Sequence, residues 1–266
     1  ETPVAFSSTE WKKAKRMTER TLHHCGCVGL SPVPYKRVVD DMRVRDTLES
    51  KSGWPAYATR KTPEVVKQSI QDAQNGLWKT YPAIALFRNY NAKTRLVWMY
   101  PMSCNLVEGS YFQPLQSKLM RSEEAWQFLS PWNGFQTVRE NVSTAYSPSN
   151  NLALAASDFS ATDAHFTLAA SLEVSDVLET CFQPRYRELL RESITYMHNI
   201  PLVISPDSKL VGVHGVASGS NWTNFLETIF DMIFSFYVRF KEESIFGSRP
   251  HLNGFAFSSG YYAIGD

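Results

Sequence analysis

Three acidic positions and one glycine-rich loop are the parts of this sequence whose residue types and spacing could perform chemistry. Asp158 and Asp163 lie five positions apart, directly after the small, apolar run 152–157. Carboxylates at the end of a buried strand can hold hard divalent cations, and paired cations stabilise the attacking and leaving oxygens of nucleotidyl transfer. Acidic residues also cap helices at such spacings, so this pair alone leaves both interpretations open.

The glycine-rich stretch 212–219 leads directly into a strongly apolar segment that begins at Trp222. Backbone amides at the start of a helix can donate to phosphate or sugar oxygens, and Thr223 and Asn224 add polar groups in the first turn. An ordinary loop with Ser or Asn as the helix cap is the structural alternative. A third feature is Gly265-Asp266, which follows an aromatic and apolar run. The glycine permits backbone angles that an unusual turn requires.

The elements that must position these residues mix helices and strands without a regular alternation, which predicts an α+β architecture. Apolar spacings of three and four residues from Trp222 to Phe240 predict a largely buried helix. Helices are also predicted at 9–20, 62–75 (with Thr62 as cap and Pro63 at the first position), 122–129 and 164–181, and strands within 83–100, 152–157 and 255–264.

Composition sets limits on the class of protein. With 266 residues, 43% hydrophobic and 20% charged, the chain can bury a core, and its net charge of +1 neither favours nor excludes a polyanionic partner. The apolar stretch 225–238 contains Glu227 and Asp231, so it does not fit a membrane span. Four dispersed cysteines favour a reducing compartment over a disulfide framework. The first residues lack an initiator Met, so we expect that the natural N-terminus lies elsewhere.

The three features occur in the order Asp-x4-Asp, Ser-Gly-x3-Thr-Asn and Gly-Asp, and this ordered set resembles palm motifs A, B and C of viral RNA-dependent RNA polymerases. Asp266 is similar to the first aspartate of a Gly-Asp-Asp turn. Arg88 and the run 93–101 resemble the basic fingers motif F. The run 97–101, Asn105 and 111–115 are similar in particular to the picobirnavirus polymerase.

The resemblance implies a right-hand polymerase with partial fingers at 1–146 and a partial palm at 147–266, in which helices back an antiparallel sheet. We expect the thumb to be missing, the chain to end within the catalytic turn, and the 266 residues alone to be inactive. The implied site residues are Asp158 and Asp266 for catalysis and two Mg²⁺ or Mn²⁺ ions; Asp163, Ser218, Thr223 and Asn224 for ribose selection; Gly219 for loop movement; and Arg88, Lys93 and Arg95 for the nucleotide phosphates.

Two of these implications agree with residue chemistry. Alternation along a strand puts Lys93 and Arg95 on one face, although an exposed basic strand could also be merely solvated. A carboxylate with an amide, as in Asp163 and Asn224, can bond a ribose 2′-hydroxyl, which both donates and accepts. This pair favours ribonucleotides over the deoxyribonucleotides of reverse transcriptases.

The implied partners are RNA template and product, nucleoside triphosphates and the viral capsid protein, with no membrane, in the host cytoplasm or the virion interior. A reverse-transcriptase-like palm polymerase and a non-catalytic RNA-binding viral protein remain as alternatives.

Overall fold

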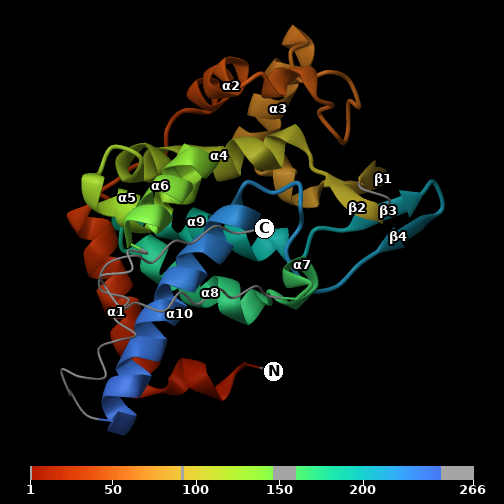
Figure 1. Cartoon of the computed structure of the whole chain (residues 1–266). Helices are drawn as coiled ribbons and strands as arrows, with labels where there is room; N and C mark the ends of the chain where they lie inside the picture. Colours follow the sequence, from red (N-terminus) through yellow and green to blue (C-terminus); the bar gives the residue numbers. More distant parts are fainter. Residues whose placement is uncertain (1, 91–92, 146–159, 247–266) are drawn as a thin grey trace.

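The computed structural model describes residues 2–90, 93–145 and 160–246 (Figure 1). Its α-helices are α1 (Thr9–His24), α2 (Tyr35–Val44), α3 (Pro63–Gln74), α4 (Met102–Leu119), α5 (Glu123–Leu129), α6 (Phe135–Ala145), α7 (Thr162–His165), α8 (Leu168–Glu179), α9 (Arg187–Met197) and α10 (Trp222–Phe246). Its strands are β1 (Ala83–Tyr90), β2 (Lys93–Met99), β3 (Leu202–Ser205) and β4 (Ser208–Leu210). The 3₁₀ turns are Val4–Ser7, Thr47–Glu49, Leu77–Thr80, Ser130–Asn133 and Pro184–Tyr186.

The four strands form one mixed sheet in the order β2-β1-β3-β4. β1 pairs with β2 and β3 pairs with β4 in antiparallel fashion, whereas β1 and β3 run parallel. Two hairpins far apart in the sequence therefore join through their inner strands, and this sheet extends to one side of the helical body in Figure 1. The described sheet is thus mixed, whereas the antiparallel sheet was expected for the palm. The strands predicted at 152–157 and 255–264 for the palm lie outside the described residues.

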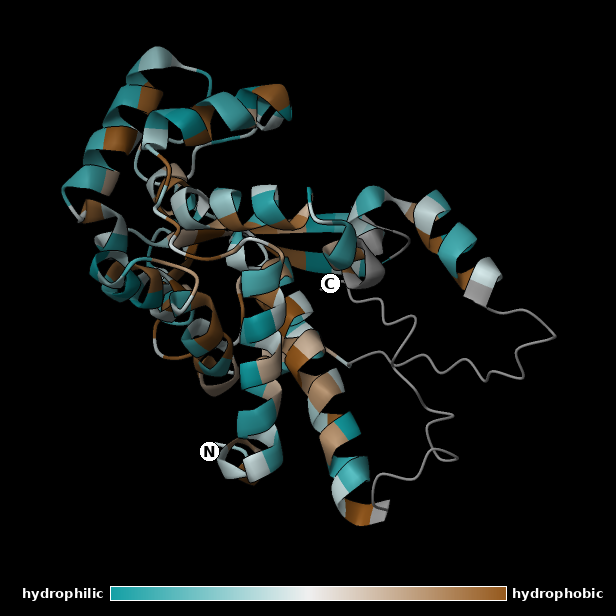
Figure 2. Ribbon diagram, turned by 90° about the vertical axis from the view of Figure 1, so that its left-hand side faces the viewer, coloured by the Kyte–Doolittle hydropathy of each residue, from teal (hydrophilic) through white to brown (hydrophobic). Residues whose placement is uncertain are grey.

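The helical core is built around α4 and α10. α4 is buried along most of its length, from Met102 to Tyr111. α10 runs beside α1, as the two views in Figures 1 and 2 agree, and it buries Trp222, Phe225 and Ile229. The alternating hydropathy along the helices in Figure 2 matches this partial burial. No helix in the described parts of the chain is long and apolar enough to cross a membrane.

Most predicted elements are confirmed, with shifted ends. The segment 83–100 forms the β1–β2 hairpin, and Pro63 opens α3, although the Thr62 side chain makes no capping hydrogen bond. The helix predicted at 164–181 is instead split into α7 and α8, because Thr167 starts a new helix by accepting a hydrogen bond from the Ala170 amide. Ser8 caps α1 in the same way through the Trp11 amide.

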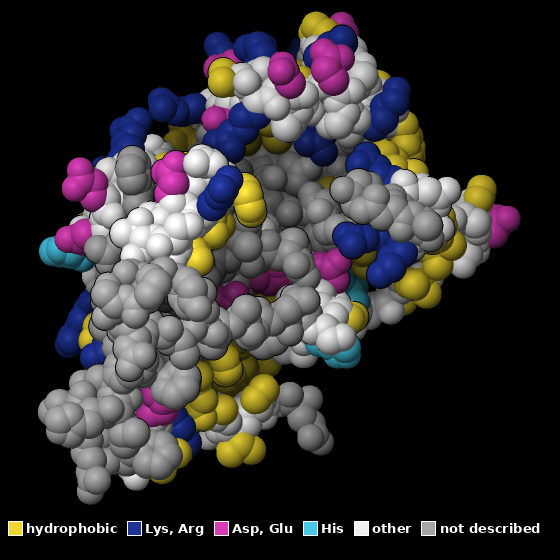
Figure 3. All heavy atoms as spheres, in the orientation of Figure 1, with side chains coloured by type: hydrophobic (Ala, Val, Ile, Leu, Met, Phe, Trp, Pro, Cys, Tyr) yellow, Lys and Arg dark blue, Asp and Glu magenta, His cyan; other side chains and the backbone are white. Residues whose placement is uncertain are grey.

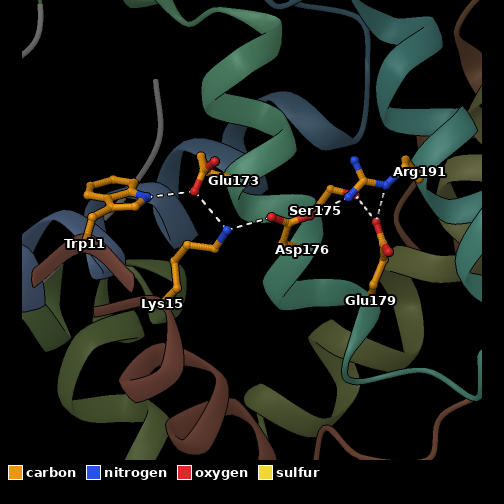
Figure 4. A network of polar contacts seen from close by, with 7 residues as sticks. All are labelled: Trp11, Lys15, Glu173, Ser175, Asp176, Glu179 and Arg191. Carbon is orange, nitrogen blue, oxygen red and sulfur yellow. Dashed lines mark hydrogen bonds and ion pairs between the residues drawn. The ribbon is translucent and has the colours of Figure 1, made fainter. Parts of the chain in front are cut away.

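A polar network ties α1, α8 and α9 together on one side of the core (Figure 4). The Lys15 ammonium lies 2.8 Å from Glu173 and 2.6 Å from Asp176. Its other members are Trp11, which donates to Glu173, Ser175, which donates to Glu179, and Arg191, which pairs with Asp176 and Glu179. This network links α8 to α1 on one side and to α9 on the other.

Candidate active site

The glycine-rich loop packs directly against the segment that carries Asp163. A Cβ atom at Gly215 would lie 1.9 Å from the Asp163 carbonyl oxygen and 3.0 Å from the Ala164 carbonyl carbon. Only glycine permits so close an approach between two backbones. Asp163 itself is exposed in the single turn α7, after Ala161 in a left-handed conformation with φ 51°. Two of the predicted motifs are therefore neighbours in space although they are separated by about fifty residues.

The same loop also contacts strand β2. A Cβ atom at Gly219 would lie 2.0 Å from the Trp98 carbonyl oxygen, and the Trp98 amide donates to the Ser218 hydroxyl at 3.2 Å. Ser218 is exposed, whereas Val216 and Ala217 before it are buried. The loop thus places the exposed Ser218 beside β2.

The two polar residues in the first turn of α10 differ in their surroundings. Thr223 is 4% exposed, and its hydroxyl donates to the Ala217 carbonyl at 2.7 Å. Thr223 therefore stabilises the loop through its hydrogen bond to the buried Ala217. Asn224 is half-buried, one position further along the turn.

His198, at the C-terminal end of α9, fixes the start of the loop. Its Nδ1 lies 2.8 Å from the His214 carbonyl oxygen, and its Nε2 lies 2.7 Å from the Ser171 hydroxyl. The His214 amide in turn donates to the His198 carbonyl. Burial lowers the pKa of His198 to about 4, so the ring stays neutral at physiological pH and can accept from Ser171 while donating to His214.

Sequence reasoning did not assign roles to His198, Glu108 or Arg60. Glu108 is 2% exposed and contacts the far end of the loop through Ser220 and Asn221. The available signal was weak: Glu108 is the one acidic residue in the segment that forms α4, and a carboxylate is rarely buried without polar partners. Its partners, however, lie more than one hundred residues away in the chain.

The predicted phosphate-binding residues share one face of the β1–β2 hairpin. Arg88 and Arg95 are directly opposite in the register, and Lys93 lies two positions before Arg95 on β2. All three are exposed, so this face carries like charges side by side. Figure 3 shows Lys and Arg side chains gathered over the region of this hairpin, beside a hollow in the surface. The like-charged side chains repel one another in the free protein, and a bound polyanion would relieve this repulsion.

The two carboxylates expected to hold metal ions, Asp158 and Asp266, lie outside the described residues. Within the described ranges, no group of three or more His, Cys, Asp and Glu side chains is placed to hold a metal ion. The donor set that the sequence offers consists of carboxylate oxygens. These are the ligands that Mg²⁺ and Mn²⁺ prefer, so the residue chemistry fits such ions.

Comparison with known proteins agrees with this geometry. The family model described as viral RNA-dependent RNA polymerase matches residues 90–253. A potential RNA-dependent RNA polymerase of a human picobirnavirus (strain Human/Thailand/Hy005102/-) is 25% identical over 141 residues, which are 52% of this chain and 26% of that protein.

Two solved structures share the fold. The crystal structure of a human picobirnavirus RNA-dependent RNA polymerase superposes with a TM-score of 0.67 at 19% identity, over 91% of this chain and 47% of the other. An insertion-loop deletion mutant of a human picobirnavirus polymerase gives 0.66 at 19% identity, over 88% and 47%. This chain thus spans about half the length of those structures. The resemblance predicted from the sequence is confirmed, and the chain belongs to the family of viral RNA-dependent RNA polymerases.

Proposed function

We propose that this chain forms part of the nucleotide-binding and catalytic region of an enzyme that copies RNA from an RNA template. The observation that supports the proposal most strongly is the convergence of three segments. Gly215 lies against the Asp163 backbone, and Ser218 and Gly219 lie against β2, which carries the exposed basic residues. The groups proposed for sugar binding therefore lie next to the strand that carries two of the residues proposed for phosphate binding, an arrangement that suits a nucleoside triphosphate.

On this proposal the β1–β2 hairpin binds the triphosphate. Arg88, Lys93 and Arg95 face one side of the hairpin, so their positive charges can meet the incoming phosphates together. Their mutual repulsion in the free protein is relieved when the phosphates bind. Guanidinium groups suit this role because they can donate two parallel hydrogen bonds to one phosphate.

Ribose selection is assigned to Asp163 and Asn224, with Ser218 in the loop. The carboxylate accepts from the 2′-hydroxyl, and the amide can donate to it or accept from it. Because Thr223 uses its hydroxyl on Ala217, we assign it an indirect part, through the position of the loop. Gly219 has the corresponding task of letting the loop approach β2.

We further propose that Asp158 and Asp266 bind two divalent cations, Mg²⁺ or Mn²⁺. When bound, these ions supply charge neutralisation for the triphosphate and lower the pKa of the attacking 3′-hydroxyl. The proposed organisation is fingers at 1–146 and palm at 147–266, with RNA and nucleoside triphosphates as partners. The host cytoplasm or the virion interior is the proposed location, and the capsid protein is a further proposed partner.

Primer extension on an RNA template tests the proposal. The full-length protein from the reading frame that contains these residues is assayed with ribonucleotides and with deoxyribonucleotides. We expect ribonucleotides to be incorporated, and Asp158→Ala to abolish incorporation while the fold is retained. Preferred incorporation of deoxyribonucleotides would favour a reverse transcriptase. RNA binding without incorporation by the natural sequence would favour the non-catalytic alternative.

A second measurement does not depend on turnover. Mg²⁺ or Mn²⁺ is expected to raise the thermal stability of the natural protein and not that of Asp158→Ala, because an ion that binds only the folded state stabilises it. Equal stabilisation of both proteins would remove Asp158 from the proposed metal site.

A further inference from the structure

The far end of the glycine-rich loop is attached to helix α4 by a buried carboxylate. The Ser220 hydroxyl donates to Glu108 Oε1 at 2.7 Å, and the Asn221 amide donates to Glu108 Oε2 at 2.8 Å. Ser220 also accepts from the Trp222 amide at 3.1 Å and so caps α10. One carboxylate therefore fixes both the last turn of the loop and the start of the helix that carries Asn224.

Asn105, one turn earlier on α4, completes the attachment. Its side-chain amide donates to the Gly219 carbonyl at 3.1 Å and lies 3.4 Å from Glu108 Oε2. Its backbone carbonyl accepts from the Asn221 side chain at 3.0 Å. Arg60 donates to the Asn105 side-chain oxygen at 2.9 Å, so every polar group of the Asn105 side chain is used.

The charged and titratable groups near Glu108 come from three elements. Arg60 lies in the segment before α3, Tyr100 directly follows β2, and Cys104 is on α4 itself. Arg60 is the positive one, and it lies close enough to Glu108 to compensate part of its charge. Burying a carboxylate costs desolvation free energy, which the donors on both oxygens offset only in part. Such a group is therefore expected where the position of the loop is important for function.

We propose that Glu108 and Asn105 are positioning residues that hold the loop 215–221 against β2 and thereby determine how strictly the site selects ribonucleotides. This inference rests on the proposed polymerase function. The contacts run from α4 to Gly219, Ser220 and Asn221, which flank Ser218 on one side and lead to Asn224 on the other. Neither α4 residue is assigned a contact with nucleotide.

Glu108→Gln in the full-length protein is the central variant. It keeps the size of the side chain but has only one terminal acceptor, so the Ser220 hydroxyl and the Asn221 amide can no longer both donate to it. Ser103→Ala is the matched control, because Ser103 is buried on the same helix and its hydroxyl has no hydrogen-bond partner among the described residues. Ser220→Ala and the double variant Ser220→Ala/Glu108→Gln test whether the two groups act through each other.

Hydrogen exchange gives a readout that is independent of catalysis. In Glu108→Gln we expect the amides of Asn221 and Trp222 to exchange at least about tenfold faster, while the Ser103→Ala control stays unchanged. Unchanged exchange at both amides in Glu108→Gln would overturn the inference and leave the polymerase proposal standing.

Nucleotide selection gives the functional readout. The ratio of kcat/KM for ribonucleotide over deoxyribonucleotide should fall at least about fivefold in Glu108→Gln, with no further fall in the double variant beyond that of the single ones. An equal loss of kcat for both sugars would indicate a merely structural role and overturn the inference. If exchange is faster in Glu108→Gln but the natural protein incorporates no nucleotide, the attachment of the loop is confirmed, while its role in sugar selection and the polymerase proposal are both refuted.

Discussion

Gly215→Ala is the substitution whose consequences can be worked out most directly from the structure. The added Cβ would lie 1.9 Å from the Asp163 carbonyl oxygen, whereas real Cβ atoms keep about 3.0 Å or more from other heavy atoms. The two backbones must therefore separate by about 1 Å. No side-chain rotation can relieve the contact, because the neighbouring atom belongs to the main chain. Gly215 has no positive φ, so steric crowding is the cause of the expected effect.

The expected cost follows from this geometry. Overpacking typically costs about 1–3 kcal/mol, and a rigid backbone neighbour puts this site at the upper end, about 3 kcal/mol. For a protein of this size each kcal/mol lowers Tm by about 2–4 °C, so Gly215→Ala should lower Tm by about 6–12 °C. The displacement of the loop from Asp163 should also reduce the preference for ribonucleotides by about tenfold to a hundredfold, since misplacement by about 1 Å has effects of that order.

Gly134→Ala is the control variant, which should lower stability without changing the preference for ribonucleotides. Gly134 has φ +97° and no atom within 4 Å of an added Cβ, so its variant carries backbone strain of about 1–2 kcal/mol and no clash. We expect a lower Tm and an unchanged choice of sugar, measured by thermal denaturation and by primer extension with both nucleotide types. An unchanged Tm and unchanged selection in Gly215→Ala would refute the contact between the loop and Asp163.

Three further predictions concern charge. Burial raises the pKa of Glu108 to about 7, so the folded state holds this proton more tightly than the unfolded chain, and stability should fall by about 3 kcal/mol as the pH rises from 4.5 through 7; urea denaturation of Glu108→Gln should show a flatter profile in that window, and an identical slope would contradict the assignment. Arg95→Ala should raise KM for nucleotides about tenfold in steady-state incorporation while keeping or slightly raising Tm, because it removes repulsion from Arg88 directly opposite; a lower Tm with normal KM would count against phosphate binding. Lys15→Met should cost about 1–2 kcal/mol in urea denaturation, because it leaves the partly buried Glu173 and the exposed Asp176 without their shared partner, whereas Lys61→Met, from an exposed pair, should cost about 0.5 kcal/mol or less; equal effects would show that the network does not stabilise α8.

The order and chemistry of the motifs could be predicted from the sequence because they depend on neighbouring residues. Asp163, the glycine-rich loop and the basic strand are each recognisable within about ten residues, and the apolar periodicity of α10 follows from its own side chains. The hairpin at 83–100 and the start of α3 at Pro63 are likewise specified by residues that are neighbours in the sequence. The roles of Asp158 and Asp266 remain predictions, because both residues lie outside the described part of the chain.

Only the tertiary structure decided which segments meet. The parallel pairing of β1 with β3 joins strands more than one hundred residues apart, and no local pattern specifies it. Burial of the Glu108 carboxylate beneath Ser220 and Asn221 likewise depends on how α4 packs under the loop. The physical reason is that the energy of a buried polar group depends on the partners that surround it, and those partners are brought together by packing of the whole chain rather than by sequence order.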